Sequence, residues 1–256
     1  MKRTFVVAGN GPSISELEAG RILADDFIVR TNNFYFEPEF FLGRRVDMMF
    51  MGGDPRVAPF IFETIHQCRS DYDIKTWSTH DPRVARAGAK RFKSAFQPMS
   101  YRDEAVKESV ERLSNHYDRK PTTGVQAILK AHALGADTII LAGIDFYAQP
   151  RRYTYQLGPH YQALMGKDIS SRGVDTRLHS PELDLDILRA LQDREDLLLL
   201  RAGPSEMLAP IMDLAPIRYG TPVVSEPRDN PPTDWASFSG LYSIEMLKLL
   251  RRGSAL

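Results

Sequence analysis

The strongest constraint on the fold is a regular alternation of short apolar strands with amphipathic helices. The expected strands are Thr4–Ala8, Phe27–Arg30, Asp47–Met51, Tyr72–Trp77, Ala136–Ala142 and Leu197–Leu200. The expected helices begin at Ser13 and cover Ala58–Cys68, Ala105–His116, a segment that ends at Leu134, and Leu183–Asp193. Such alternation is typical of a parallel sheet covered by helices. The sequence therefore predicts an α/β fold with a single Rossmann-like, doubly wound parallel sheet.

Composition narrows the class of protein. The chain has 256 residues and a formal net charge of zero, which gives no support for a general nucleic-acid binder. Its single cysteine, Cys68, has no partner for an internal disulfide, as is usual in a reducing cytoplasm. No apolar run reaches the roughly 18 residues of a membrane span. We therefore expect a cytoplasmic protein.

Two segments stand apart from the alternating pattern. Residues 148–177 lack steady periodicity and are too long for an ordinary connection, so we expect them to form a lid within a catalytic domain of residues 1–216. Residues 217–256 form an extension with a basic amphipathic helix over Leu241–Arg252. That helix fits a peripheral contact with the inner membrane, a docked terminal helix or an oligomer contact.

Polar and aromatic residues follow the expected strand Ala136–Ala142. They are Gly143, Ile144, Asp145 and Tyr147, with Tyr153 a little further on. In open α/β sheets, ligands bind beyond the carboxyl ends of the strands, so a nucleotide is expected here. Tyrosine hydroxyls can donate to a phosphate, and His179 can accept a proton at neutral pH. Together they predict group transfer from a nucleotide donor.

The turn after the first strand is a second candidate. Gly9 and Gly11 let backbone amides approach a phosphate, and a helix N-terminus behind them favours an anion. Ser13 and Glu16 have the spacing of a capping box at that N-terminus. The dinucleotide fingerprint needs a third glycine where Ile14 stands, which argues against an NAD-dependent oxidoreductase. A purely structural turn explains the two glycines equally well.

Three further motifs each have a structural and a functional interpretation. Asn32 and Asn33 follow the second strand and either contact a base or sugar or form a turn pair. Thr122, Thr123 and Gly124 precede a helix and either bind an anion or cap that helix. Asp184-Leu185-Asp186 matches the D-x-D pattern of metal-dependent glycosyltransferases, but residues i and i+2 of a helix face apart. We expect a solvated helix face there and no metal site.

These motifs occur together, in order, in one family. Ala8–Ser13, Arg30–Glu37 with Leu42-Gly43, Thr122–Val125, Gly143–Tyr147, Tyr153, His179-Ser180 and Leu214–Pro216 resemble the bacterial lipooligosaccharide sialyltransferases of glycosyltransferase family 42. The resemblance covers roughly Lys2 to Pro216. It implies a fold of the GT-A-variant type and metal-independent, inverting transfer from CMP-sialic acid to a glycan hydroxyl, without a further cofactor. It also implies a homo-oligomer acting in lipopolysaccharide biosynthesis.

The resemblance also assigns roles to residues. It implies that His179 is the general base and that Tyr147 and Tyr153 stabilise the departing phosphate. The donor-binding residues that it implies are Asn10, Gly11, Ser13, Asn32, Thr122, Thr123, Gly124, Gly143, Ile144 and Asp145.

Two departures concern the sugar side of the donor. Gly52 stands where the family pattern has an asparagine, and the basic residue before Thr122 is offset to Arg119 or changed to Lys120. Another CMP-activated keto-sugar, such as Kdo or another nonulosonate, is therefore an alternative donor. A non-catalytic CMP-sugar-binding homologue is a further alternative.

Overall fold

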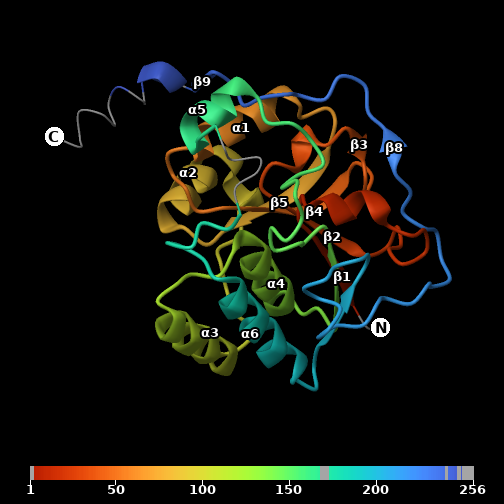
Figure 1. The fold of residues 1–256 in the computed structure, drawn as a ribbon. Coiled ribbons are helices and arrows are strands. Elements are labelled where there is room, and N and C mark those ends of the chain that lie inside the picture. The colour runs from red at the N-terminus through yellow and green to blue at the C-terminus, as the bar shows by residue number, and fades with distance from the viewer. Residues whose placement is uncertain (1–2, 168–172, 240–241, 247–248, 250–256) are drawn as a thin grey trace.

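A parallel sheet of six strands forms the centre of the molecule (Figure 1). The computed structural model describes residues 3–167, 173–239, 242–246 and 249. The strand order is β5-β4-β2-β1-β6-β7, and every neighbouring pair is parallel. The six strands are β1 Thr4–Ala8, β2 Phe27–Thr31, β4 Arg45–Met51, β5 Asp73–Thr79, β6 Thr138–Ala142 and β7 Leu198–Arg201. The predicted α/β class and parallel sheet are confirmed.

Helices and short elements connect these strands. The α-helices are α1 Ala58–Gln67, α2 Pro82–Phe92, α3 Glu104–Tyr117, α4 Thr123–Ala133, α5 Pro159–Met165 and α6 Pro181–Gln192. The 3-10 helices are η1 Pro12–Glu16, η2 Phe34–Phe36 and η3 Lys93–Ala95. Two-residue strands form the pairs β3 Glu39–Phe40 with β8 Glu226–Pro227, and β9 Phe238–Ser239 with β10 Tyr242–Ser243. Sequence reasoning missed α2, an eleven-residue helix rich in basic residues, and α5, whose seven residues are fewer than the window over which a helical period can be read.

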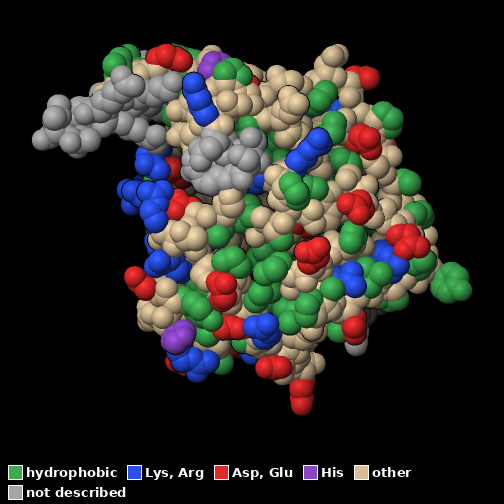
Figure 2. All heavy atoms as spheres, in the orientation of Figure 1, with side chains coloured by type: hydrophobic (Ala, Val, Ile, Leu, Met, Phe, Trp, Pro, Cys, Tyr) green, Lys and Arg blue, Asp and Glu red, His purple; other side chains and the backbone are tan. Residues whose placement is uncertain are grey.

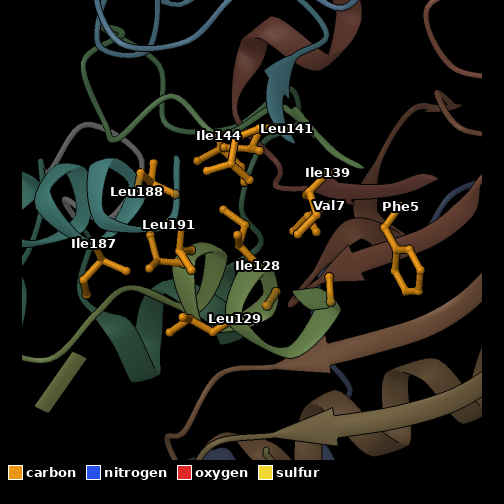
Figure 3. Close-up of a cluster of buried hydrophobic side chains, with 14 of the residues drawn as sticks. Phe5, Val7, Ile128, Leu129, Ile139, Leu141, Ile144, Ile187, Leu188 and Leu191 are labelled. Atoms are coloured by element: carbon orange, nitrogen blue, oxygen red, sulfur yellow. The ribbon is translucent and has the colours of Figure 1, made fainter. Parts of the chain in front are cut away.

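Helices α3, α4 and α6 cover one face of the sheet. Figure 3 shows side chains of β1 and β6 pointing toward those of α4 and α6, with Val7, Ile139, Ile128 and Leu188 among them. All four are 1% exposed or less. Burying a side chain of this size contributes about 1.5–3 kcal/mol to stability, so this layer holds α4 and α6 firmly against the strands.

On the opposite face of the sheet, a helix covers one end and mostly non-helical chain covers the rest. Helix α1 packs over the β4–β5 end, where Phe62 meets the ring of Trp77 edge-on. Over β1, β2 and β6 the cover is η1 and extended chain, which contribute Ile14, Ile22 and Ala215. The doubly wound arrangement is therefore helical on one face and only partly helical on the other.

The helix predicted at Ser13 is wrong in type. The chain forms the five-residue 3-10 helix η1, with Gly11 as N-cap and no side-chain capping bond. The Ser13 hydroxyl donates to Asp145 instead, so the predicted capping box with Glu16 does not form. A long-range carboxylate has replaced the local partner that the sequence spacing suggested.

The C-terminal chain returns to the body of the molecule. Trp235 and Ile244 are buried in the core beside α1, and Asp234 caps α5 by accepting from the amides of His160 (2.6 Å) and Tyr161 (2.9 Å). The predicted boundary at residue 216 stays a prediction. The predicted helix Leu241–Arg252 is wrong at its start, where Tyr242–Ser243 forms β10 instead, and half of its residues lie outside the described ranges. No helix in the described ranges is long and apolar enough to cross a bilayer.

Candidate active site

A cleft lies beyond the carboxyl ends of β1, β2 and β6. This is the point where the strand order reverses, since β2 lies on one side of β1 and β6 on the other. Ligands of open α/β sheets bind at such a point. The cleft has about 630 Å³ of empty space, open solvent included. Its lining residues are Gly9, Asn10, Gly11, Pro12, Thr31, Asn32, Thr122, Thr123, Gly124, Gly143, Ile144, Asp145, Phe146, Tyr147, Arg151, Arg152 and Tyr153.

The glycines of the β1 turn hold two loops together. The amide of Gly9 donates to Ala142 O and that of Gly11 to Gly143 O, both at 2.9 Å. A Cβ atom on Gly9 would lie 2.3 Å from Gly143 O, and one on Gly11 would lie 2.3 Å from Asp145 Oδ2. The two amides that we expected to approach a phosphate are therefore occupied by protein carbonyls. The donor-binding role of Gly11 stays a prediction.

A buried carboxylate fills the N-terminus of η1. Asp145 Oδ2 accepts from the Ser13 amide at 3.0 Å, and Oδ1 accepts from the Ser13 hydroxyl. Burial raises the pKa of Asp145, and its bonds to Ser13 oppose that rise. We expected the N-terminus of η1 to bind a ligand anion, but an anionic side chain of the protein already occupies it.

The asparagines after β1 and β2 are divided between the cleft and the core. Asn10 lines the cleft and donates to Thr31 O at 2.9 Å. Asn32 also lines it, in a left-handed backbone conformation (φ +50°), and accepts from the Gly52 amide at 2.7 Å. Asn33 is buried elsewhere and bonds to Tyr161. Of the predicted asparagine pair, only Asn32 reaches the cleft.

The start of α4 opens toward the cleft. Thr122 is the N-cap, but its amide donates to Asp184 Oδ1 at 3.0 Å and its hydroxyl to Asp184 Oδ2 at 2.6 Å. The Thr122 side chain makes no capping bond to α4, and Thr123 and Gly124 line the cleft. An uncapped helix N-terminus attracts anions because its first amides and the helix dipole are both positive.

The predicted solvated face is wrong for Asp184. This side chain is 0% exposed, and burial raises its pKa to about 7 despite the two bonds from Thr122. Asp186 does lie at the surface, where it accepts from Tyr117 Oη at 2.6 Å and pairs with Arg189. Within the described part of the chain, no three His, Cys, Asp or Glu side chains come together as a candidate metal site.

Two tyrosines and an arginine form the opposite wall. Phe146 and Tyr147 both have positive φ (+48° and +61°) in a turn closed by the Ala148 amide on Asp145 O, and such strain is typical of functional loops. The Arg152 guanidinium lies over the Tyr147 and Tyr153 rings, with Cζ at 4.3 and 5.5 Å from their centroids. Sequence reasoning missed Arg152, although the Tyr- and Arg-rich composition of its segment was the available signal.

His179 lies just before α6 with one ring nitrogen engaged. Its Nδ1 is 2.7 Å from Lys120 O, and a carbonyl only accepts, so Nδ1 carries the proton. The imidazole is half-exposed, burial lowers its pKa, and the nearby charge of Arg152 contributes to that lowering. In the neutral ring, Nε2 therefore has a free lone pair. This geometry suits a general base.

A second histidine adjoins His179. His80 follows β5 directly, and its Nε2 would lie 2.7 Å from a Cβ atom on Gly53. Burial lowers the pKa of His80, and His179 and Lys120 lower it further. The structure thus brings a second imidazole close to His179. Its position after a strand end was the signal that could have found it.

The sequence and the fold both resemble those of known sialyltransferases. The family model described as alpha-2,3-sialyltransferase (CST-I) matches residues 3–75. The predicted resemblance to bacterial sialyltransferases is confirmed. The matched segment runs from β1 to the start of β5 and includes the cleft residues Asn10 and Asn32. No curated protein matches the sequence significantly.

Solved sialyltransferase structures share the fold over nearly the whole chain. CstII from Campylobacter jejuni in complex with the substrate analogue CMP-3FNeuAc is 20% identical with a TM-score of 0.77, covering 98% of this chain and 99% of that one. The monofunctional alpha-2,3-sialyltransferase Cst-I from Campylobacter jejuni is 21% identical with a TM-score of 0.76, covering 99% and 95%. CST-II with a trisaccharide acceptor and CMP is 20% identical with a TM-score of 0.76, covering 93% and 96%.

Proposed function

We propose that this protein transfers sialic acid from CMP-sialic acid to a hydroxyl of a terminal sugar on a cell-surface glycan. The observation that carries the proposal is the His179 tautomer, with Nδ1 held by Lys120 O and the ring near enough to the cleft residue Arg152 for that charge to lower the His179 pKa. Similar folds occur in sialyltransferases solved with CMP and with a trisaccharide acceptor, which supports this choice of donor and acceptor. The transfer inverts the anomeric centre and needs neither a metal nor a cofactor beyond the donor.

The chemistry follows from the two walls of the cleft. Nε2 of His179 takes the proton of the acceptor hydroxyl as its oxygen attacks the anomeric carbon. The bond from that carbon to the phosphate oxygen breaks, and CMP leaves with the electron pair. The positive groups that meet the developing phosphate charge are Arg152, the hydroxyls of Tyr147 and Tyr153, and the first amides of α4. Preorganised donors of this kind account for much of enzymatic rate enhancement.

The decisive experiment measures CMP release from CMP-sialic acid, with EDTA present and with or without a galactose-terminated acceptor. We expect acceptor-stimulated release in the wild type. We expect His179→Ala to lower kcat by about 10²–10⁴-fold, the usual contribution of a positioned base. His116→Ala, on the exposed surface of α3, is the matched control and should leave kcat unchanged. Near-wild-type turnover by His179→Ala would remove the base assignment, and dependence on added metal would remove metal independence.

The leaving-group wall has its own test. Tyr153→Phe keeps the ring that stacks on Tyr155 at 5.1 Å and under Arg152, and removes only the hydroxyl. Losing one preorganised donor to developing charge costs about 2.7–4 kcal/mol in transition-state free energy. We therefore expect kcat to fall on the order of 100-fold while the Kd for CMP changes little. An equal loss in kcat and in CMP affinity would contradict the leaving-group role.

One observation supports a second donor. A Cβ atom on Gly52 would lie 3.0 Å from Asn32 Oδ1 and 3.3 Å from Thr123 Oγ1, so a side chain at this position would crowd both cleft residues. This is the position where the family pattern has an asparagine. We therefore include CMP-Kdo as a parallel donor in the release assay. Faster acceptor-stimulated release from CMP-Kdo than from CMP-sialic acid would assign the enzyme to another keto-sugar.

A further inference from the structure

Helix α2 has one strongly basic face. Arg83, Arg86 and Lys90 are exposed and follow the spacing i, i+3 and i+7, which places them along one side of the helix, and the exposed Lys93 follows as its C-cap. The opposite side packs inward through Val84, Gly88 and Phe92, whose ring stacks on Trp77 at 3.7 Å. Figure 2 shows Lys and Arg side chains gathered at the left edge, where Figure 1 places α2.

Most of this charge is not neutralised by neighbours. Among the described residues, Arg83 pairs with Asp81 at 3.3 Å, and Arg91 pairs with Glu63 at 2.9 Å. Arg86, Lys90 and Lys93 form no ion pair within the described part of the chain. Five basic side chains and two carboxylates leave a local excess of three positive charges, although the whole chain has no net charge. Such an asymmetry indicates a surface for an anionic partner.

The shape of the basic face favours a planar partner. The residues between the charges on its outer side are small, since Ala87 and Ala89 are exposed there. The outer face carries no exposed aromatic ring on which a nucleic-acid base could stack. It also lacks a large apolar side chain that could insert between lipids, so its contact must be electrostatic and shallow. A straight row of charges without insertion anchors fits the surface of an anionic bilayer.

The first turn of α2 lies near His179, since the charge of His179 lowers the pKa of the neighbouring His80. Asp81, which caps α2 by accepting from the Arg83 and Val84 amides, follows His80 directly. We propose that the outer face of α2 docks this protein on an anionic lipid bilayer, next to the mouth of the cleft. This surface is distinct from the predicted C-terminal helix, and the docking does not depend on which sugar is transferred.

Vesicle sedimentation of the full chain tests the proposal. We expect binding to phosphatidylcholine vesicles that contain phosphatidylglycerol, no binding to pure phosphatidylcholine, and release by 0.5 M salt, because screening weakens the attraction of charges that stay in solvent. Each basic residue near an anionic membrane is worth a factor of roughly five, so Arg86→Gln/Lys90→Gln/Lys93→Gln should lower the partition coefficient about 100-fold. Unchanged CMP binding by this variant would show that it is folded.

Two control variants separate α2 from other basic surfaces. Lys107→Gln/Arg112→Gln/Arg189→Gln removes the same charge from α3 and α6 and should bind vesicles like the wild type. Lys248→Gln/Arg251→Gln/Arg252→Gln removes the basic residues of the predicted C-terminal helix. Loss of binding only in this last variant would overturn the proposal, as would an equal loss in all three. Tighter binding to a DNA duplex than to the anionic vesicles would also overturn it.

Discussion

Two buried carboxylates accept hydrogen bonds in almost the same way at two helix starts beside the cleft. Asp145 accepts from the amide and the hydroxyl of Ser13 at the start of η1. Asp184 accepts from the amide and the hydroxyl of Thr122 at the start of α4. Burial raises the pKa of both. From the sequence, both helix starts were equal candidates for binding a ligand phosphate.

The two helix starts differ in which of their positive groups remain free to face the cleft. At η1 the carboxylate lies at the first turn of a five-residue 3-10 helix, and the turn glycines are bonded to β6, so little positive charge faces the cleft. At α4 the carboxylate holds only the N-cap residue, and Thr123 and Gly124 still line the cleft on an eleven-residue helix. The α4 end is therefore the better anion site. The η1 end is better suited to uncharged parts of a donor.

The largest expected difference between the two carboxylates is in pH dependence. The folded-state pKa of Asp184 is raised from 3.8 to about 7, so the folded protein binds more protons than the unfolded one between these values. Stability should therefore fall as the pH rises from about 4 to about 7, by roughly 4 kcal/mol from this group. Urea denaturation across this range should show a flatter profile for Asp184→Asn than for the wild type. An unchanged slope in Asp184→Asn would show that Asp184 is not the titrating group.

A smaller difference is expected on truncation. Asp184→Ala removes the acceptor of the Thr122 amide and hydroxyl and leaves a cavity at a 0% exposed position, which should cost about 3 kcal/mol of stability at pH 5. Asp145→Ala should cost about 1 kcal/mol, because Asp145 lines the cleft and water can replace its bonds to Ser13. Denaturant midpoints with equal m-values measure both. Equal losses in the two variants would contradict the distinction between the two walls.

The smallest expected effect concerns CMP binding. Thr123→Asp places a carboxylate at the open end of α4, where it should weaken CMP binding roughly tenfold while stabilising the helix by about 0.3–1 kcal/mol. Ser15→Asp adds the same charge at an exposed position of η1 that does not line the cleft, and it should leave CMP affinity unchanged. Calorimetric titration of CMP into both variants checks the assignment. Loss of affinity only in Ser15→Asp would move the anion site to η1.

Sequence reasoning was most accurate where a local pattern controls the structure. The apolar run Thr4–Ala8 forms β1 with the predicted bounds, and α4 starts at the predicted Thr-Thr-Gly turn. It failed at the basic helix α2 and at α5, which has only seven residues. Capping by Asp234, from the far end of the chain, holds α5 in place, and no local signal reveals this.

The sequence by itself determined the α/β sheet and which loops meet beyond its carboxyl edge. The alternation of apolar strands with helices is a local property of the sequence, and it implies that the strands pair in parallel. Only the tertiary structure decided which polar groups at that edge are free. Ser13 and Asp145 are 132 residues apart and Thr122 and Asp184 are 62 apart, so no spacing rule links them. Their pairing occupies part of the apparent phosphate site, and it leaves the α4 end and Arg152 to line the cleft, with His179 near Arg152. The physical reason is that burial forces each carboxylate to find donors, and the fold alone brings those donors within reach.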